Sequence, residues 1–253
     1  MNRREMLKTA AAIVASPALV PAAPAPVQDV VQHPMWFYPR EVLGHDVLYA
    51  QRGPESVGFA LATAMTYREA YQAHVHRTNI HLLDGVSIYN ACRSNYNKRP
   101  YVSHPIRYGA LGEWGIKEVV YPGARIDTPT GPGRLLASVT IVESVEDADK
   151  CIRRREPVVI FSNQGFRPNK DPNGIWEPKG HWPHGLTLVH IDNDEGTGYL
   201  ANTWQHWPFL WSNDGRTKTI DEAPANVFRT RLETIEKMLR QRESWAINRV
   251  KVA

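Results

Sequence analysis

The feature that most restricts the fold is the segment from Ser56 to about His76. It is rich in Ala, Leu, Met and Tyr and contains no Pro, which predicts one long, largely buried helix. The chain has 253 residues, of which 42% are hydrophobic, so it is long enough for one large domain or two small lobes around a proper core. Ser56 stands where the loop "QRGPE" gives way to this helix.

The elements that follow divide the chain into a helical half and a mainly antiparallel half. "VSIYNACRSNYNK" and "HPIRYGALGEWG" predict two further helices, the second ending at Gly115. "YPGARIDTPTGPGR" is rich in Pro and Gly and is typical of a linker. Beyond it the sequence predicts a strand in "ASVTIV", a helix in "VEDADKCIRRRE", a strand in "PVVIF", a hairpin of "HGLTLVHI" and "GYLANTW" around "DNDEG", a helix from about Ala223 to Gln241 and a strand in "SWAINRVKV". The expected fold class is therefore α+β, with a cleft between two lobes.

The N-terminus has the pattern of an export signal. Arg3 and Arg4 precede an apolar stretch from Thr9 to Val20, which is followed by the small-residue and proline segment "PAAPAPVQ". This order resembles a bacterial twin-arginine signal peptide, and the apolar stretch is shorter than the ~20 residues that span a bilayer. We expect residues 1–25 to be the signal peptide, with no stable membrane span, and the protein to be periplasmic or secreted.

Charge and cysteine content exclude several classes of function. The formal net charge of +4 is too small for nucleic-acid binding, and the densest basic run, Arg153 to Arg155, is typical of a solvated helix face. Cys92 and Cys151 have no second Cys or His at metal-ligand spacing, and "DNDEG" lacks the Gly and Glu of a calcium loop. We therefore expect neither metal nor cofactor. In an oxidising compartment the two cysteines could pair, which the spacing does not decide.

The residues that carry chemistry lie in the second half. His184 opens one strand of the predicted hairpin and Asn202 closes the other, which places both side chains at the same end of the sheet. An amide oxygen that holds one ring nitrogen fixes the imidazole tautomer and leaves the other nitrogen for a nucleophile. Trp204, two residues further on, would shield that hydrogen bond from water. Taken singly, each residue has an ordinary structural explanation, because a histidine at a strand end is usually a satisfied or exposed polar residue.

Together these residues resemble the papain-like cysteine peptidase superfamily. Its pattern is Gln, then Cys at a helix N-terminus, then His before an apolar strand, then Asn-Ser-Trp. Here the order is Gln51, Ser56 with "SVGFALA", then "HGLTLV" from His184, then Asn202-Thr-Trp204. Divergent bacterial and phage members are the most similar, and "SNQGF" and "ESWAI" extend the resemblance over nearly the whole mature chain.

The resemblance implies the organisation of the chain and the roles of the site residues. An N-terminal extension (26–50) would precede a helical lobe (51–130) and a β-rich lobe (131–253), with a substrate cleft between them. Gln51 and the backbone N–H of residue 56 would form the oxyanion hole. His184 would be the base and Asn202 its orienting partner.

The sequence departs from the family at the nucleophile. Ser56 stands where the family has Cys, and Gln51 precedes it by five residues where six are usual. A hydroxyl is far less acidic than a thiol, so a Ser-His-Asn site is expected to be slow or dead. Ser56 is thus a helix N-cap, a working nucleophile, or the remnant of a lost cysteine. Cys92, within the "IYNACR" helix, is expected to pack rather than react.

These observations lead to three functional hypotheses. The first is a catalytically silent or weakened peptidase that keeps a cleft for a peptide or protein. The second is an active peptidase, a hydrolase of peptide bonds that uses Ser56, His184 and Asn202. The third is a structural envelope protein in which the His-Asn pair belongs to the core.

Overall fold

The structure is a computed structural model, and residues 33–253 form one compact unit. Within it the structure describes residues 33–47, 55–78, 80, 83–97, 124–128, 131–164, 166–168, 175–179, 184–202, 224 and 226–252. The expected signal peptide (1–25), the expected helix at 104–115, Gln51 and Trp204 all lie outside the described residues. Export and signal cleavage therefore stay predictions.

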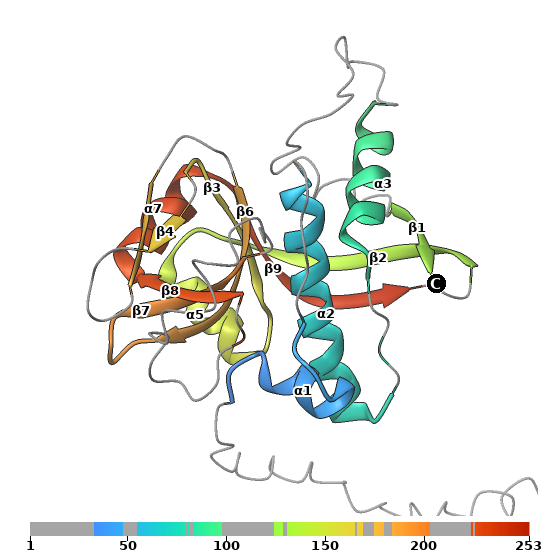
Figure 1. Cartoon of the computed structure of the whole chain (residues 1–253), viewed down its shortest axis with the longest axis horizontal. Coiled ribbons are helices and arrows are strands. Elements are labelled where there is room, and N and C mark those ends of the chain that lie inside the picture. Colours follow the sequence, from blue (N-terminus) through green and yellow to red (C-terminus); the bar gives the residue numbers. More distant parts are fainter. Residues whose placement is uncertain are drawn as a thin grey trace, which may run out of the picture. The chain divides into compact units, whose positions relative to one another are not determined.

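The helix expected from Ser56 is present as α2 (Ser56–His76) and is buried over most of its length. Helix α3 (Gly85–Asn97) packs beside it (Figure 1). The backbones approach closely because Gly58 has no side chain, and a Cβ there would lie 2.2 Å from the carbonyl oxygen of Gly85. The carboxylate of Asp84 accepts hydrogen bonds from the N–H groups of Val86 and Ser87, which satisfies the start of α3.

An antiparallel sheet forms the second half, as the α+β expectation requires. Its seven strands have the order β1-β2-β9-β3-β6-β7-β8, so the late strand β9 joins two earlier groups of strands (Figure 1). The strands are β1 (Ala124–Thr128), β2 (Gly131–Val142), β3 (Val158–Ser162), β6 (His184–Asp192), β7 (Thr197–Ala201), β8 (Val227–Arg231) and β9 (Ser244–Val252). A separate hairpin consists of β4 (Phe166–Pro168) and β5 (Trp176–Pro178).

Both faces of the sheet are buried where β3 and β9 meet. Val159 and Phe161 face the core shared with α2 and α3, whereas Val158 and Ile160 face a second core. This alternation is the period of two expected of a strand. The second core is closed by α5 (Val145–Arg153) and α7 (Leu232–Gln241). As a result, α2 packs on the opposite face of β3 from α5 and α7.

Two expected elements differ from the structure. The predicted linker at 121–134 is wrong, because residues 124–128 and 131–134 pair as the hairpin β1–β2. Pro132 lies before Leu135, where pairing of β2 with β9 begins, so its missing N–H breaks no bond to β9. The helix expected from Ala223 begins only at Leu232. Residues 227–231 form β8 instead, because their β-branched and aromatic side chains are buried in a sheet that continues from β7.

The expected boundary between lobes, after residue 130, falls between the paired strands β1 and β2. The division into a helical lobe and a β-rich lobe stays a prediction. Residues 33–47 of the expected N-terminal extension include α1 (Phe37–Leu43). Met35 and Trp36 in this segment are buried against Tyr67 of α2 and against Tyr199 of β7.

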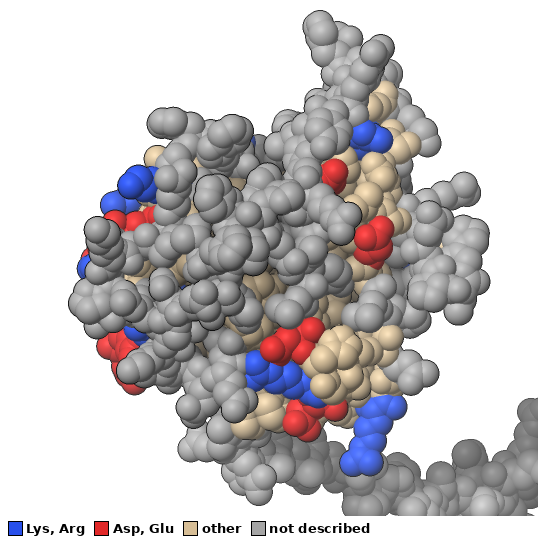
Figure 2. All heavy atoms as spheres, viewed as in Figure 1, with Lys and Arg blue, Asp and Glu red and all other residues tan. Residues whose placement is uncertain are grey.

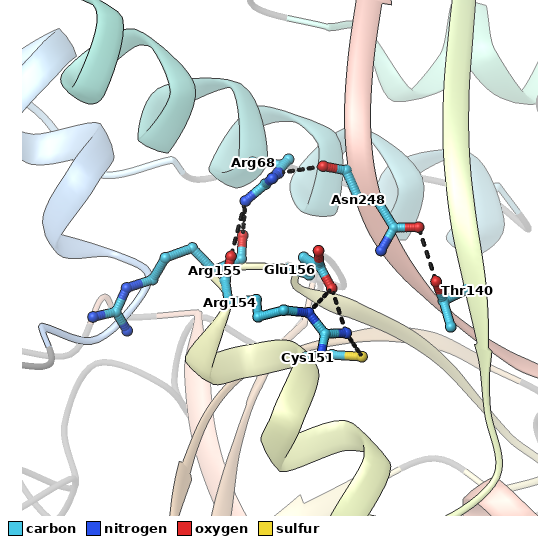
Figure 3. Close-up of polar contacts among 7 residues, drawn as sticks. All are labelled: Arg68, Thr140, Cys151, Arg154, Arg155, Glu156 and Asn248. Atoms are coloured by element: carbon cyan, nitrogen blue, oxygen red, sulfur yellow. Dashed lines mark hydrogen bonds and ion pairs between the residues drawn. The ribbon is translucent and has the colours of Figure 1, made fainter. Parts of the chain in front are cut away.

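The basic run at 153–155 is only partly a solvated helix face. Arg153 is exposed and pairs with Asp149 on the same helix, whereas Arg155 is buried, has a left-handed backbone (φ 62°) and lies over the ring of Tyr38. Figure 3 shows that Arg68 of α2 reaches the end of α5, where its guanidinium donates to the carbonyls of Arg154 and Arg155 and to that of Asn248 on β9. The guanidinium of Arg68 therefore links α2 to β9 and to the residues that follow α5. On the face shown in Figure 2, acidic and basic side chains of the described residues lie next to one another in several places.

Candidate functional site

Ser56 is the first residue of α2, and only 4% of it is exposed. The N-cap position belongs to Glu55, and no side chain caps the helix. The structure therefore does not use Ser56 as the cap of α2. The first backbone bond into the helix comes from the N–H of Phe59 to the carbonyl of Glu55, so the N–H of Ser56 is among those that a helix leaves without an internal partner.

His184 and Asn202 lie together at one end of the hairpin β6–β7. Nε2 of His184 and Oδ1 of Asn202 are 2.7 Å apart, a short hydrogen bond in which the ring N–H donates to the amide oxygen. This bond assigns the proton to Nε2 in the neutral ring and makes Nδ1 the acceptor nitrogen. The backbone of Asn202 is held in turn, because its N–H donates to the carbonyl of Asn226.

The start of α2 lies against the start of β6. At Gly185, the residue after His184, an added Cβ would come within 3.2 Å of the Ser56 carbonyl oxygen and 3.3 Å of its carbonyl carbon. A side chain at position 185 would require the neighbouring backbone of Ser56 to shift by a few tenths of an ångström. The structure therefore places the backbone of Ser56 beside Gly185, the residue that follows His184 of the His184–Asn202 pair, although positions 56 and 184 are 128 apart in the sequence. The catalytic roles of Ser56, His184 and Asn202 stay predictions.

The electrostatics of the site favour a neutral imidazole. Burial lowers the pKa of His184 below its usual value, and this outweighs the hydrogen bond to Asn202, which raises it. Asn202 contributes an amide dipole but no negative charge, so it orients the ring without stabilising an imidazolium as a carboxylate would.

Both cysteines are free and buried. Cys92 lies in the core shared by α2 and α3, and burial raises the pKa of its thiol well above the usual value. Cys151 lies in the second core, and there too burial raises the thiol pKa. The disulfide between Cys92 and Cys151, which the sequence left open, is thus not formed. Cys92 packs in the core, as expected of a thiol inside a helix.

The described part of the chain contains no cluster of three metal-ligating side chains. Among the same residues, no helix is both long enough and apolar enough to cross a bilayer.

Sequence reasoning missed three residues that contact the elements of the site: Gly185, Thr187 and Asn226. Gly185 was part of a strand motif, and Thr187 and Asn226 carried no signal of their own.

The chain has an α+β fold in which the His184–Asn202 pair lies beside the start of α2. One solved structure with this fold is xylellain, a cysteine protease from Xylella fastidiosa, with a TM-score of 0.51 and 14% identity over 81% of this chain and 83% of that chain. A putative C39-like peptidase from Bacillus anthracis has a TM-score of 0.41 and 16% identity over 83% of this chain and 98% of that one. No protein-family model and no curated protein matches the sequence. At 14% identity the likeness to xylellain is one of fold.

Proposed function

We propose that this chain is an exported papain-like protein that binds a peptide or protein and is silent or slow as a peptidase. The observation that carries the proposal is the His184–Asn202 hydrogen bond beside the start of α2, with a serine as the first residue of that helix. This arrangement supports a papain-like site that keeps its base and loses its thiol. The fold of xylellain supports a peptide as the ligand.

The serine explains the expected loss of rate. A thiol near pKa 8.5 becomes a thiolate at a helix N-terminus beside a charged imidazole. A hydroxyl is a far weaker acid than a thiol, so forming the same ion pair with a serine costs much more free energy. The lowered pKa of His184 also disfavours the imidazolium partner. A resting Ser56–His184 ion pair is therefore inaccessible.

The alternative is an active peptidase that never forms this pair, and the neutral His184 favours it. The Ser56 hydroxyl would attack the peptide carbonyl while its proton passes to Nδ1 of His184, and the imidazolium would then give that proton to the leaving amine. Water would attack the resulting ester and release the acid and the free serine. The Ser56 N–H, with Gln51, would bind the oxyanion. Asn202 would orient the ring but leave the imidazolium without a carboxylate, so turnover would be slow.

A peptide-library assay separates these hypotheses. Wild type, Ser56→Cys, Ser56→Ala and Ser56→Cys with His184→Ala are compared for cleavage and for binding of fluorescent peptides. We expect wild type and Ser56→Ala to bind without cleaving, and Ser56→Cys to cleave only when His184 is present. Cleavage by wild type that Ser56→Ala abolishes would establish the active peptidase instead. Failure of every variant to bind or cleave would favour the structural envelope protein.

Export is the second part of the proposal. Arg3 and Arg4 support a twin-arginine route, which carries folded proteins. In a bacterial host we expect the wild-type chain in the periplasm or medium, and the variant with Arg3→Lys and Arg4→Lys as uncleaved precursor in the cytoplasm. A wild-type chain that stays uncleaved in the cytoplasm would contradict export.

A further inference from the structure

A buried hydrogen bond links the helix that carries Ser56 to the strand that carries His184. Oγ1 of Thr187 on β6 donates to the carbonyl oxygen of Ala60 on α2 at 2.9 Å. Thr187 has no exposed surface, and Ala60 is 1% exposed. Because no water reaches this bond, the hydroxyl depends on Ala60 for its partner.

The bond lies directly behind the candidate site. Ala60 is four residues after Ser56, one turn along α2, and Thr187 is three residues after His184. Gly185 and Thr187 are two residues apart on β6 and therefore point to the same face of the strand, the face against α2. Gly185 allows the close approach of helix and strand, but a contact of this kind does not fix how far the helix slides along the strand.

A hydrogen bond fixes that sliding because it is directional. Its strength falls steeply when donor and acceptor move out of line, so a shift of α2 along β6 would break the bond. The reactive distance between a nucleophile and its base tolerates little displacement, and misplacement by about 1 Å is enough to cost a large factor in rate.

We propose that Thr187 is a positioning residue that sets the distance between the side chain at position 56 and the imidazole of His184. The inference rests on the proposed function, because it assigns to Thr187 the alignment of that same site. Thr187 acts through α2 and touches no substrate.

The test uses the full chain with Ser56→Cys, because a thiol at position 56 reports on its distance from the base. The second-order rate constant for alkylation by iodoacetamide is measured over about pH 5 to 9, the range in which activated and ordinary thiols ionise. Wild type is the blank, because it measures any alkylation of Cys92 and Cys151. Thr187→Val removes the hydroxyl and keeps the shape, and Thr187→Ser is the matched control that keeps the hydroxyl.

We expect the thiol of Ser56→Cys to react in the acidic range, with an apparent pKa below the ordinary value of about 8.5. Thr187→Val should raise that pKa and lower the alkylation rate near pH 6 by about fivefold or more, whereas Thr187→Ser should stay within about twofold of the parent. If Thr187→Val does not fold, Thr187→Ala against Thr187→Ser makes the same comparison.

Two other outcomes would overturn the inference in different ways. A lower melting temperature for Thr187→Val with an unchanged alkylation profile would make Thr187 merely structural. An unactivated thiol in Ser56→Cys, with no response to His184→Ala, would overturn the proposed function itself and leave Thr187 nothing to position.

Discussion

Gly58→Ala tests whether the contact between α2 and α3 governs stability at the start of α2. By helix propensity alone the change should stabilise the chain, because Ala is favoured over Gly inside a helix by about 1 kcal/mol. The structure predicts the opposite sign. The new Cβ would lie 2.2 Å from the carbonyl oxygen of Gly85 and 2.7 Å from the Cβ of Tyr89.

The size of the effect follows from what must move. An ordinary contact begins at 3.4 Å, so the backbone of α3 would have to retreat by roughly 1 Å at Gly85. Overpacking of a rigid contact costs about 1–3 kcal/mol, and more where backbone meets backbone. After the gain in propensity, we expect the free energy of unfolding to fall by about 2 kcal/mol.

Urea denaturation of the full chain measures this change. Val75→Ala is the matched control in the same helix, because Val75 is 51% exposed and its replacement changes propensity without a clash. The control should be neutral or slightly stabilising. A Gly58→Ala chain as stable as wild type, or more stable, would refute the close approach of α2 and α3.

Arg68→Lys should lower the free energy of unfolding by about 2–3 kcal/mol, because one ammonium cannot reach all three carbonyls that the guanidinium binds. Urea denaturation measures this change, and an unchanged midpoint would contradict the role of Arg68. Burial lowers the pKa values of His184 and His190 in the folded chain. Around and below about pH 6.5 the unfolded chain therefore binds more protons than the folded chain does. The free energy of unfolding should then fall as the pH drops from about 7 to 5. His190→Gln should lose less stability over that range, and an equal loss would exclude His190 as a source. Cys92 and Cys151 are both free and buried, so the native protein should show no thiol that reacts rapidly with a disulfide reagent. After denaturation in guanidinium, two thiols should react. Detection of one thiol or none in denaturant would contradict this prediction.

Strong local patterns in the sequence predicted the parts of the fold that local physics determines. Helix α2 begins at Ser56 and ends at His76, as its composition indicates. The hairpin β6–β7 forms around the turn "DNDEG", and with it the hydrogen bond from His184 to Asn202. These elements need only neighbours in the sequence to be recognised.

The remainder depended on partners far away in the chain. Val227–Arg231 continues a helical pattern in sequence, yet pairing with β7 makes it a strand. The Pro and Gly residues near 131 belong to a hairpin and not to a linker. Only the pairing of β1 with β2 shows this. Likewise, the hydroxyl of Thr187 has significance only through Ala60, 127 residues earlier. No spacing rule connects such positions.

The position of β9 in the sheet has a consequence for the order in which the molecule is made. In the sheet of described residues, β9 is the only strand that connects two groups of strands by hydrogen bonds. One group is β1 and β2, and the other is β3, β6, β7 and β8. A ribosome synthesises β9 after every strand that it joins. Until β9 emerges, the edges of β2 and β3 that it covers in the final sheet lack their partner, and each is a template for wrong pairing.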